Sequence, residues 1–339
     1  MANKTTGLFL GKFAPLHKGH QLVIETALRE VDNLIVMVYD CPETTKIPLS
    51  VRSNWIRKLY PSVEIIEAWD GPTEVGYTKR IKKENEDYVL GILGKRKITH
   101  FYSSEPYGEH MSVALNAKNR QVDLRRGAVP ISGTEIRKNP FKNKTNLEPL
   151  VYRDLVSNIV ILGAPSSGKT TLTKELARKF KTSWMPEYGR EYWDKNQVNR
   201  RLTLKQLAEI AKGHLEREDK ALLESDNYLF TDTNAITTYL FSLYYHGKAD
   251  PELKRIAETC VSRYDLVFVC DIDIPYDDTW DRSGEVNREV FHKQTIAYLK
   301  EHKIPFILLN GSLKERISHV ERVLKRFNKY DNFLGESVK

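Results

Sequence analysis

The sequence predicts an α/β protein of two domains, each built on a parallel sheet wound with helices. Its 339 residues exceed what one hydrophobic core usually organises. Strand-like and helix-like stretches alternate through both halves, which favours parallel sheets that bind ligands beyond the carboxyl ends of their strands. A polar stretch at 138–157, which contains two prolines, interrupts this alternation near the middle of the chain.

The first half begins with two strand–helix pairs and continues with two short strands around a charged helix. We expect strands at 8–10, 33–39, 63–68 and 100–103, and helices at 19–31, 49–60 and 78–93. The second half repeats the alternation. There we expect strands at 158–163, 228–231, 265–270 and 305–309, and helices at 169–180, 204–224, 234–245 and 285–301. The predicted organisation is a domain at 1–145, a linker at 146–157, a second domain at 158–330 and a frayed tail at 331–339.

Composition limits the possible classes of protein. Apolar residues make up 40% and charged residues 29%, which is typical of a globular chain, and no apolar run approaches the roughly 20 residues of a membrane helix. A strand-like segment follows the first residues directly, and the three cysteines form no C-x-x-C pair, so we expect a cytoplasmic protein without disulfides. The net charge of +8 suits anionic ligands such as nucleotides. Nucleic acid is not expected because the basic clusters are short, and a homo-oligomer remains possible.

A phosphate-binding loop opens the second half. Gly163-Ala-Pro-Ser166-Ser167-Gly168-Lys169-Thr170 satisfies G-x-x-x-x-G-K-[ST] between an apolar strand and a helix, which is the context that this motif requires. Backbone N–H groups of such a loop wrap a phosphate, the lysine neutralises β- and γ-phosphate oxygens, and the threonine can hold Mg²⁺. The alternative, a glycine loop that only turns the chain, fits this context poorly.

The P-loop alone leaves ATPase, GTPase and small-molecule kinase open, and candidates for the groups that would decide among them follow later strands. Asp232 ends an apolar strand and is a candidate metal partner, although it could equally cap the next helix. Glu187 could accept a hydroxyl proton and Arg190 could pair with phosphate, unless the two form only a surface ion pair. Arg282 lies in an acidic segment that resembles a lid and could stabilise the transferring phosphoryl group, whereas the alternative is a solvated loop.

Paired histidines mark a site in the first half. Gly11-Lys12-Phe13-Ala-Pro-Leu-His17-Lys-Gly-His20 joins the first strand to the first helix, where backbone N–H groups and the positive helix end face a bound phosphate. Histidine can donate to an α-phosphate and to the charge that develops on it. We therefore predict that His17 and His20 bind phosphate together.

A second phosphate-binding segment is expected at Ile131-Ser132-Gly-Thr134-Glu-Ile-Arg137. Ser132 and Thr134 can cap a helix, and Arg137 follows one turn later; capping alone is the alternative, but it leaves the arginine unexplained. Three further residues are weaker candidates. Phosphate or ring contacts are possible for Lys46, Arg52 and Trp69, each of which could instead be an ordinary surface or core residue.

The two motifs of the first half, G-x-F-x-P-x-H-x-G-H and I-S-x-T-x-I-R, resemble the signature pair of the superfamily that adenylylates or cytidylylates phosphorylated small molecules. Their order ahead of a P-loop, over residues 5 to 325, resembles the bifunctional nicotinamide-nucleotide adenylyltransferases and ribosylnicotinamide kinases. The resemblance implies a Rossmann-like nucleotidyltransferase fold followed by a P-loop kinase fold.

The same resemblance implies a function. The second domain would phosphorylate ribosylnicotinamide with ATP and Mg²⁺, and the first would adenylylate the product, nicotinamide mononucleotide, to NAD and pyrophosphate. His17, His20 and Arg137 would grip the ATP phosphates without a covalent intermediate, and Glu187 would be the kinase base. Some relatives carry a helix-turn-helix domain ahead of this pair. Here about six residues precede Gly7, so DNA binding through such a domain is not expected.

The resemblance and the motifs together assign a role to each candidate residue. Catalytic roles are expected for His17, His20, Arg137, Lys169, Glu187 and Asp232, with Thr170 and Asp232 at the metal. ATP contacts are expected from Gly11, Lys12, Phe13, Lys46, Ser132, Thr134, Gly163, Ser166, Ser167, Gly168, Thr170 and Arg282, and substrate contacts from Arg52, Trp69 and Arg190. Two alternative hypotheses for the function remain. One is a polynucleotide kinase joined to a nucleotidyltransferase, and the other is an active kinase whose first domain only senses nucleotides.

Overall fold

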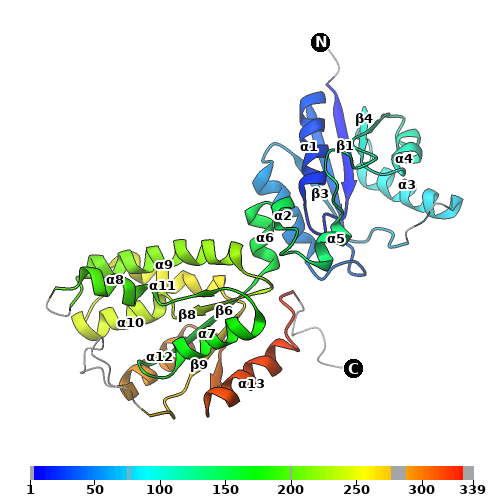
Figure 1. Ribbon diagram of the computed structural model, residues 1–339. Helices are drawn as coiled ribbons and strands as arrows, with labels where there is room; N and C mark the ends of the chain where they lie inside the picture. The colour runs from blue at the N-terminus through cyan, green and yellow to red at the C-terminus, as the bar shows by residue number, and fades with distance from the viewer. Residues whose placement is uncertain (1–3, 75, 77, 199–200, 276–287, 331–339) are drawn as a thin grey trace. The chain divides into compact units, whose positions relative to one another are not determined.

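The computed structural model describes residues 4–74, 76, 78–198, 201–275 and 288–330 (Figure 1). The chain divides into two compact units, the first ending at Tyr152 and the second comprising Arg153–Lys329. Helix α6 (Pro149–Leu155) crosses this division, within the segment expected to link two domains. The tail at 331–339 and the lid residue Arg282 lie outside the described residues.

The first unit contains a parallel sheet of five strands in the order β3-β2-β1-β4-β5. Its strands are β1 (Thr6–Gly11), β2 (Asn33–Tyr39), β3 (Glu64–Ala68), β4 (His100–Ser103) and β5 (Lys118–Gln121). Its helices are α1 (Lys18–Glu30), α2 (Leu49–Leu59), α3 (Lys79–Leu93), α4 (Gly108–Ala114) and α5 (Gly133–Lys138), followed by a 3₁₀ turn at Lys144–Asn146.

The second unit also has five parallel strands, in the order β10-β9-β6-β8-β7. They are β6 (Ser157–Gly163), β7 (Trp184–Met185), β8 (Tyr228–Asp232), β9 (Leu266–Cys270) and β10 (Ile307–Leu309). Its helices are α7 (Lys169–Phe180), α8 (Tyr188–Asn196), α9 (Leu204–Glu224), α10 (Ala235–His246), α11 (Pro251–Thr259), α12 (Arg288–Glu301) and α13 (Leu313–Leu324), with a 3₁₀ turn at Cys260–Arg263. The prediction of two α/β units with parallel sheets is confirmed.

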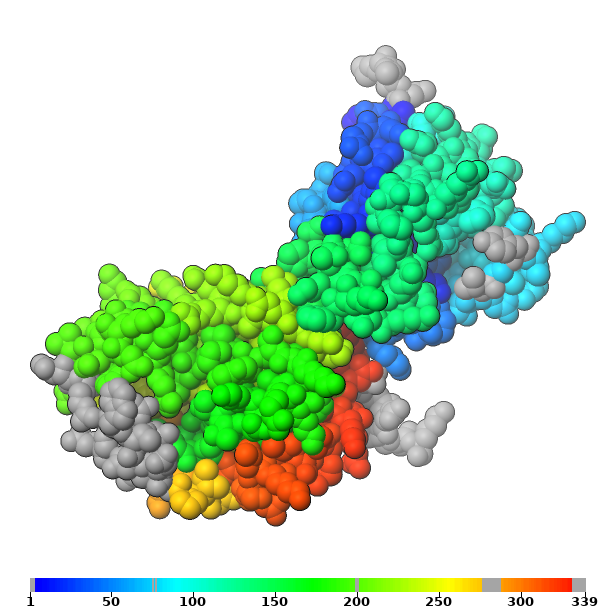
Figure 2. Space-filling model, viewed as in Figure 1, coloured from blue at the N-terminus to red at the C-terminus, as the bar shows by residue number. Residues whose placement is uncertain are grey.

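Burial on both faces explains the apolar runs of the central strands. Every residue of β6 is buried, and the space-filling view (Figure 2) shows at the surface of the second unit the green and red segments that Figure 1 draws as α7, α9 and α13. In the first unit the inner residues of β1 are buried and pair with β2 on one side and β4 on the other. Such strands read as continuous hydrophobic segments because helices cover the sheet on both faces.

Several elements were not predicted, for identifiable reasons. Strand β5, with the sequence Lys-Asn-Arg-Gln, lies at the sheet edge and forms by pairing with β4 instead of through apolar alternation. Helices α11 and α13 did carry start signals, namely Asp250 before Pro251 and a capping box of Ser312 with Glu315. The three cysteines are buried free thiols, as expected. No helix within the described ranges is long and apolar enough to cross a membrane.

In each sheet the strand order changes direction at one point. This point lies beside the strand that comes first in the sequence of that unit. In the first unit β1 lies between β2 and β4, and in the second β6 lies between β9 and β8. Loops that leave the carboxyl ends of such strands diverge to opposite faces of the sheet and leave a crevice between them. Both predicted phosphate loops, one after Gly11 and one after Gly163, leave the sheets at these positions.

Candidate nucleotide-binding sites

A cavity of about 550 Å³ lies at the carboxyl end of β1 in the first unit. It brings together both motifs of this half, although more than 110 residues separate them in the sequence. The predicted residues that line it are Gly11, Lys12, Phe13, His17, His20, Ser132, Thr134 and Arg137.

The two histidines are held by hydrogen bonds at the start of α1. His17 is the N-cap, and its Nδ1 accepts the N–H of Gly19 at 3.1 Å. The Nδ1 of His20 accepts the N–H of His17 at 3.3 Å, and the ring centroids lie 3.8 Å apart. Because Nδ1 is the acceptor in both rings, each neutral imidazole carries its proton on Nε2. The pair therefore offers two N–H donors to a ligand in the cavity.

Burial keeps both imidazoles uncharged in the free protein. It lowers the pKa of His17 to about 4, and the nearby charge of Arg126 acts in the same direction. Burial, His17 and Arg126 together hold the pKa of His20 well below its usual value. Neutral donors avoid the cost of two adjacent buried charges and still bind phosphate oxygens.

The second motif contributes the short helix α5 and its arginine. Ser132 caps the helix in a capping box with Glu135. Arg137 donates to the backbone oxygen of Ala14 at 2.6 Å and to the hydroxyl oxygen of Thr134 at 3.0 Å. Gly133 permits this approach, since a Cβ there would lie 3.3 Å from the oxygen of Ala14. The motif therefore does more than cap a helix. Ser132 caps α5, and Arg137 connects this motif to the loop that carries the histidines.

Lys12 and Phe13 differ in their surroundings. Lys12 pairs with Glu43 at 2.7 Å and donates to Thr44 at 3.0 Å along the cavity wall. Phe13 is fully buried, and its ring packs edge-on against Phe9 with centroids 5.4 Å apart. The ring of Phe13 thus packs the loop against β1. The backbone of Phe13 is in the left-handed region, with φ near 47°.

The expected substrate contact from Arg52 is wrong. Its side chain is fully buried and does not line the cavity. The guanidinium donates to the backbone oxygens of Ile47, Lys12 and Tyr39, and it pairs with Asp40 at 3.2 Å. All these acceptors belong to the protein, so Arg52 positions the loops that end β1 and β2.

Two other candidates lie outside the cavity lining. Trp69 is 58% exposed just after β3, and Lys46 is exposed in the loop before α2. In contrast, Arg126 lines the cavity but was not predicted. A signal was available, because the basic pair Arg125-Arg126 lies only four residues ahead of the second motif.

The second unit has a cavity of about 390 Å³ around the P-loop. Gly163 and Gly168 adopt positive φ values of 145° and 81°. A Cβ on Gly163 would lie 2.8 Å from the backbone oxygen of Cys270, so only glycine fits where the loop leaves β6. Ser166, Ser167, Gly168, Lys169 and Thr170 all line the cavity, as the phosphate-loop prediction requires.

Thr170 and Asp232 meet at the end of β8. The Thr170 hydroxyl donates to Oδ2 of Asp232 at 2.6 Å, while the buried Oδ1 has no hydrogen-bond partner among the residues that the structure describes. Burial, followed by the charge of Glu187, raises the pKa of Asp232 to about 6, although Lys169, Thr170 and Arg190 act in the opposite direction. A hydroxyl beside an unpartnered carboxylate oxygen is an oxygen donor set of the kind that Mg²⁺ prefers. The helix-capping alternative for Asp232 is wrong, because Asn234 caps α10.

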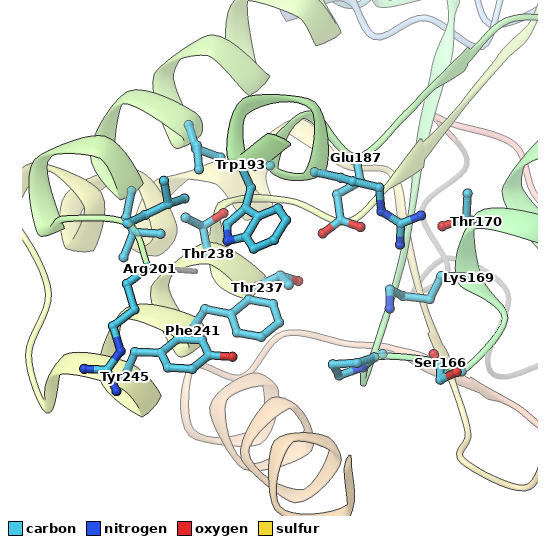
Figure 3. A pocket seen from close by; sticks show the side chains of 18 of the residues that line it. Ser166, Lys169, Thr170, Glu187, Trp193, Arg201, Thr237, Thr238, Phe241 and Tyr245 are labelled. Carbon is cyan, nitrogen blue, oxygen red and sulfur yellow. The ribbon is translucent and has the colours of Figure 1, made fainter. Parts of the chain in front are cut away.

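Lys169, Glu187 and Arg190 line the same cavity. The Lys169 ammonium donates to the backbone oxygen of Ala164 in the P-loop at 2.8 Å. To bind a nucleotide phosphate, the ammonium would exchange this hydrogen bond for one to the ligand. Glu187 is the N-cap residue of α8 but makes no side-chain cap bond. In Figure 3 its carboxylate and the Lys169 ammonium both point into the cavity. This placement is inconsistent with a purely surface role for Glu187.

Aromatic residues form the other end of this cavity and were missed from the sequence. Trp193 of α8 faces Phe241 and Tyr245 of α10 (Figure 3). Thr237, Phe241 and Tyr245 recur every four residues, which places them on one face of α10. That spacing was the available signal.

Arg316 supports the P-loop from behind and was also missed. It is 2% exposed and donates to the backbone oxygen of Ser167 at 2.6 Å. It also donates to the backbone oxygen of Gly311 at 3.0 Å and pairs with Asp273. The loop that would hold a phosphate is thereby connected to α13.

The fold and the two cavities define a protein class: a Rossmann-like nucleotide-binding domain with paired histidines, followed by a P-loop domain. Residues 8–139 match the cytidylyltransferase-like family, and residues 158–316 match a family described as an AAA domain. The chain belongs to the NadR family. It is 30% identical over 332 residues to the trifunctional NAD biosynthesis/regulator protein NadR of Salmonella typhimurium, covering 90% of this chain and 78% of that protein.

Solved structures agree with this assignment of the fold. The crystal structure of a NadR protein in complex with NR is 23% identical, with a TM-score of 0.58, and the match covers 96% of both chains. A NadR protein in complex with NAD and AMP-PNP is 21% identical, with a TM-score of 0.56 and coverage of 99% of this chain and 98% of that one. The resemblance stated from the motifs is confirmed, as is the order of the two folds.

Proposed function

We propose that this protein is a bifunctional enzyme of NAD biosynthesis. The second unit phosphorylates ribosylnicotinamide with ATP, and the first joins the resulting nicotinamide mononucleotide to the adenylyl group of a second ATP, releasing pyrophosphate. The observation that carries the proposal is the presence of two separate cavities, one per unit and each lined by a motif predicted to bind phosphate, in a chain of the NadR family. We further propose that both reactions take place in the cytoplasm, where ATP is supplied. We assign the two activities to residues 1–145 and 158–330.

The proposed kinase step needs one proton acceptor and a neutralised triphosphate. The ribose 5′-oxygen attacks the γ-phosphorus, the bond from the γ-phosphorus to the β,γ-bridging oxygen breaks, and Glu187 takes the hydroxyl proton as ADP leaves. Lys169 and the P-loop N–H groups bind the β- and γ-phosphates, and Arg190 lies where it could add a further cation. Thr170 and Asp232 would hold Mg²⁺, which when bound offsets the phosphate charge.

The proposed adenylyl transfer needs positioning and donors but no nucleophile from the protein. A phosphate oxygen of nicotinamide mononucleotide attacks the α-phosphorus of ATP, and the α,β-bridging bond breaks. Both Nε2–H groups of His17 and His20 would donate to phosphate oxygens, with Arg137 held beside them by Ala14. Lys12, Ser132 and Thr134 line the same wall and are proposed to bind the triphosphate. Because no proton moves, a pair of neutral donors suffices.

The test is a pair of assays on the full chain with ATP and Mg²⁺. Ribosylnicotinamide should yield ADP, and nicotinamide mononucleotide should yield pyrophosphate and NAD. Lys169→Met should abolish only the first reaction and His20→Asn only the second, so each variant serves as the folding control for the other. Kinase activity without pyrophosphate release would support a sensing role for the first unit instead. Turnover of oligonucleotide 5′-ends in place of ribosylnicotinamide would favour the polynucleotide kinase.

A further inference from the structure

The kinase cavity has a cation at the end opposite its P-loop. Lys169 lies at the P-loop end, and Arg190, which follows Glu187 at the start of α8, lines the same cavity. Arg201 also lines the cavity, but Figure 3 places it beside Tyr245, beyond the aromatic residues. Phosphate binding explains the first two cations but not the third.

The backbone around Arg201 is anchored. Its N–H donates to the backbone oxygen of Val198 at 3.0 Å, and its C=O accepts the N–H of Val198 at 3.1 Å. The next residue, Leu202, has its backbone oxygen 2.9 Å from Nε2 of His246, the last residue of α10. Arg201 is therefore fixed to the helix that carries Phe241 and Tyr245. No carboxylate among the described residues lies within ion-pair distance of its guanidinium.

Trp193, Phe241 and Tyr245, together termed the aromatic slot, suit a flat ring between the P-loop and Arg201. Aromatic faces attract a cationic ring, and a pyridinium riboside is one. A ring in this slot would point its 5′-hydroxyl toward Glu187 and its outer edge toward Arg201. A carbonyl oxygen on that edge can accept from a guanidinium, and a carboxylate can accept two charge-assisted hydrogen bonds in a planar fork.

We propose that Arg201 is a specificity residue that binds the ring substituent, and that the kinase accepts the carboxylate-bearing nicotinate riboside as well as the amide. This inference rests on the proposed kinase function. The chemistry is unchanged, because the same 5′-oxygen takes the γ-phosphoryl group of ATP and the same proton passes to Glu187. Arg201 adds only binding energy, and it adds more for the acid because the carboxylate also offsets the repulsion between Arg201 and the pyridinium charge.

The experiment measures kcat/KM for both ribosides with saturating ATP and Mg²⁺. For the wild-type chain we expect turnover of both. In Arg201→Gln we expect the ratio of acid to amide kcat/KM to fall about tenfold, because a charge-assisted hydrogen bond is about twice as strong as a neutral one. Arg201→Lys keeps the charge but loses the planar fork, so its ratio should lie between those of Arg201→Gln and the wild type. The matched control is Arg178→Gln, since the side chain of Arg178 on α7 is 77% exposed and its ion pair within the described part of the chain is with Glu175 of the same helix.

The outcomes separate this inference from the proposed function. Failure of the wild-type chain to phosphorylate the amide riboside would overturn the kinase function itself. Turnover of the amide but not of the acid, or an unchanged ratio in Arg201→Gln, would overturn the role of Arg201 and leave the kinase function standing. A loss of turnover that is equal for both ribosides in Arg201→Gln would identify a structural residue and would also overturn the inference.

Discussion

Replacing Arg52 by methionine tests whether this residue is structural. The substitution removes a fully buried guanidinium from three backbone oxygens and from Asp40. Hydrogen bonds to a charged group contribute about 1.5–3 kcal/mol each and do not add fully, whereas the ion pair adds less because the Asp40 side chain is 32% exposed. We take about 3–5 kcal/mol as the expected loss in the free energy of unfolding of the first unit.

In a unit of this size the loss corresponds to a fall of about 6–20 °C in melting temperature. Calorimetry should show an earlier transition for the first unit and an unchanged one for the second, with kinase activity retained. The matched control is Arg57→Met on the same helix, because Arg57 is 46% exposed and pairs with Glu67 at the surface. Its effect should stay below about 1 kcal/mol.

Steady-state kinetics of adenylyl transfer can refute the structural role of Arg52. A residue that binds substrate phosphate would raise the KM for nicotinamide mononucleotide while the melting temperature stayed within about 1 °C of the wild type. That result would restore Arg52 to the substrate site and would refute the structural role. If the buried contacts of Arg52 are structural, Arg52→Met should show both a large fall in the melting temperature of the first unit and a loss of adenylyl transfer.

Four further predictions concern the two sites. Glu187→Gln should lower the kinase kcat about 10²–10⁴-fold without changing adenylyl transfer; a loss below threefold would exclude it as the base. Asp232→Asn should weaken activation by Mg²⁺ about 10- to 100-fold, which a metal titration of kinase activity would measure, whereas an unchanged activation constant would place the metal elsewhere. Gly213→Ala should cost about 1–3 kcal/mol and reduce kinase kcat, since its Cβ would lie 2.3 Å from the ring of Tyr188; calorimetry without a shift would contradict this packing. The pKa of His17 is about 4 in the folded protein and about 6.5 in the unfolded chain, so the unfolded chain binds more protons between these pH values. The contribution of His17 to the free energy of unfolding is therefore fully present above pH 6.5 and is lost as the pH falls toward 4. His17→Asn, which can still cap α1, should flatten the dependence of melting temperature on pH over that range, and an unaltered slope would argue against a depressed pKa.

The sequence by itself determined the position of the two loops that are predicted to bind phosphate. Gly163 to Thr170 and Gly11 to His20 each occupy one strand–loop–helix junction, and both line the cavities that they predicted. Such motifs are readable because the groups that bind phosphate are backbone N–H groups, a helix terminus and side chains within a few residues of each other. The order of the two motifs along the chain was also sufficient to indicate the family.

Only the tertiary structure decided the roles of long side chains and of distant neighbours. Arg52 and Arg137 both seemed suited to phosphate, yet packing buried one among backbone oxygens and placed the other on a cavity wall. The pairing of Trp193 with Phe241 across the kinase cavity was equally invisible, because α8 and α10 are far apart in sequence. A long side chain can reach partners in many directions, so its partner is set by which segments the fold brings around it, and this depends on contacts between residues that the local sequence does not relate.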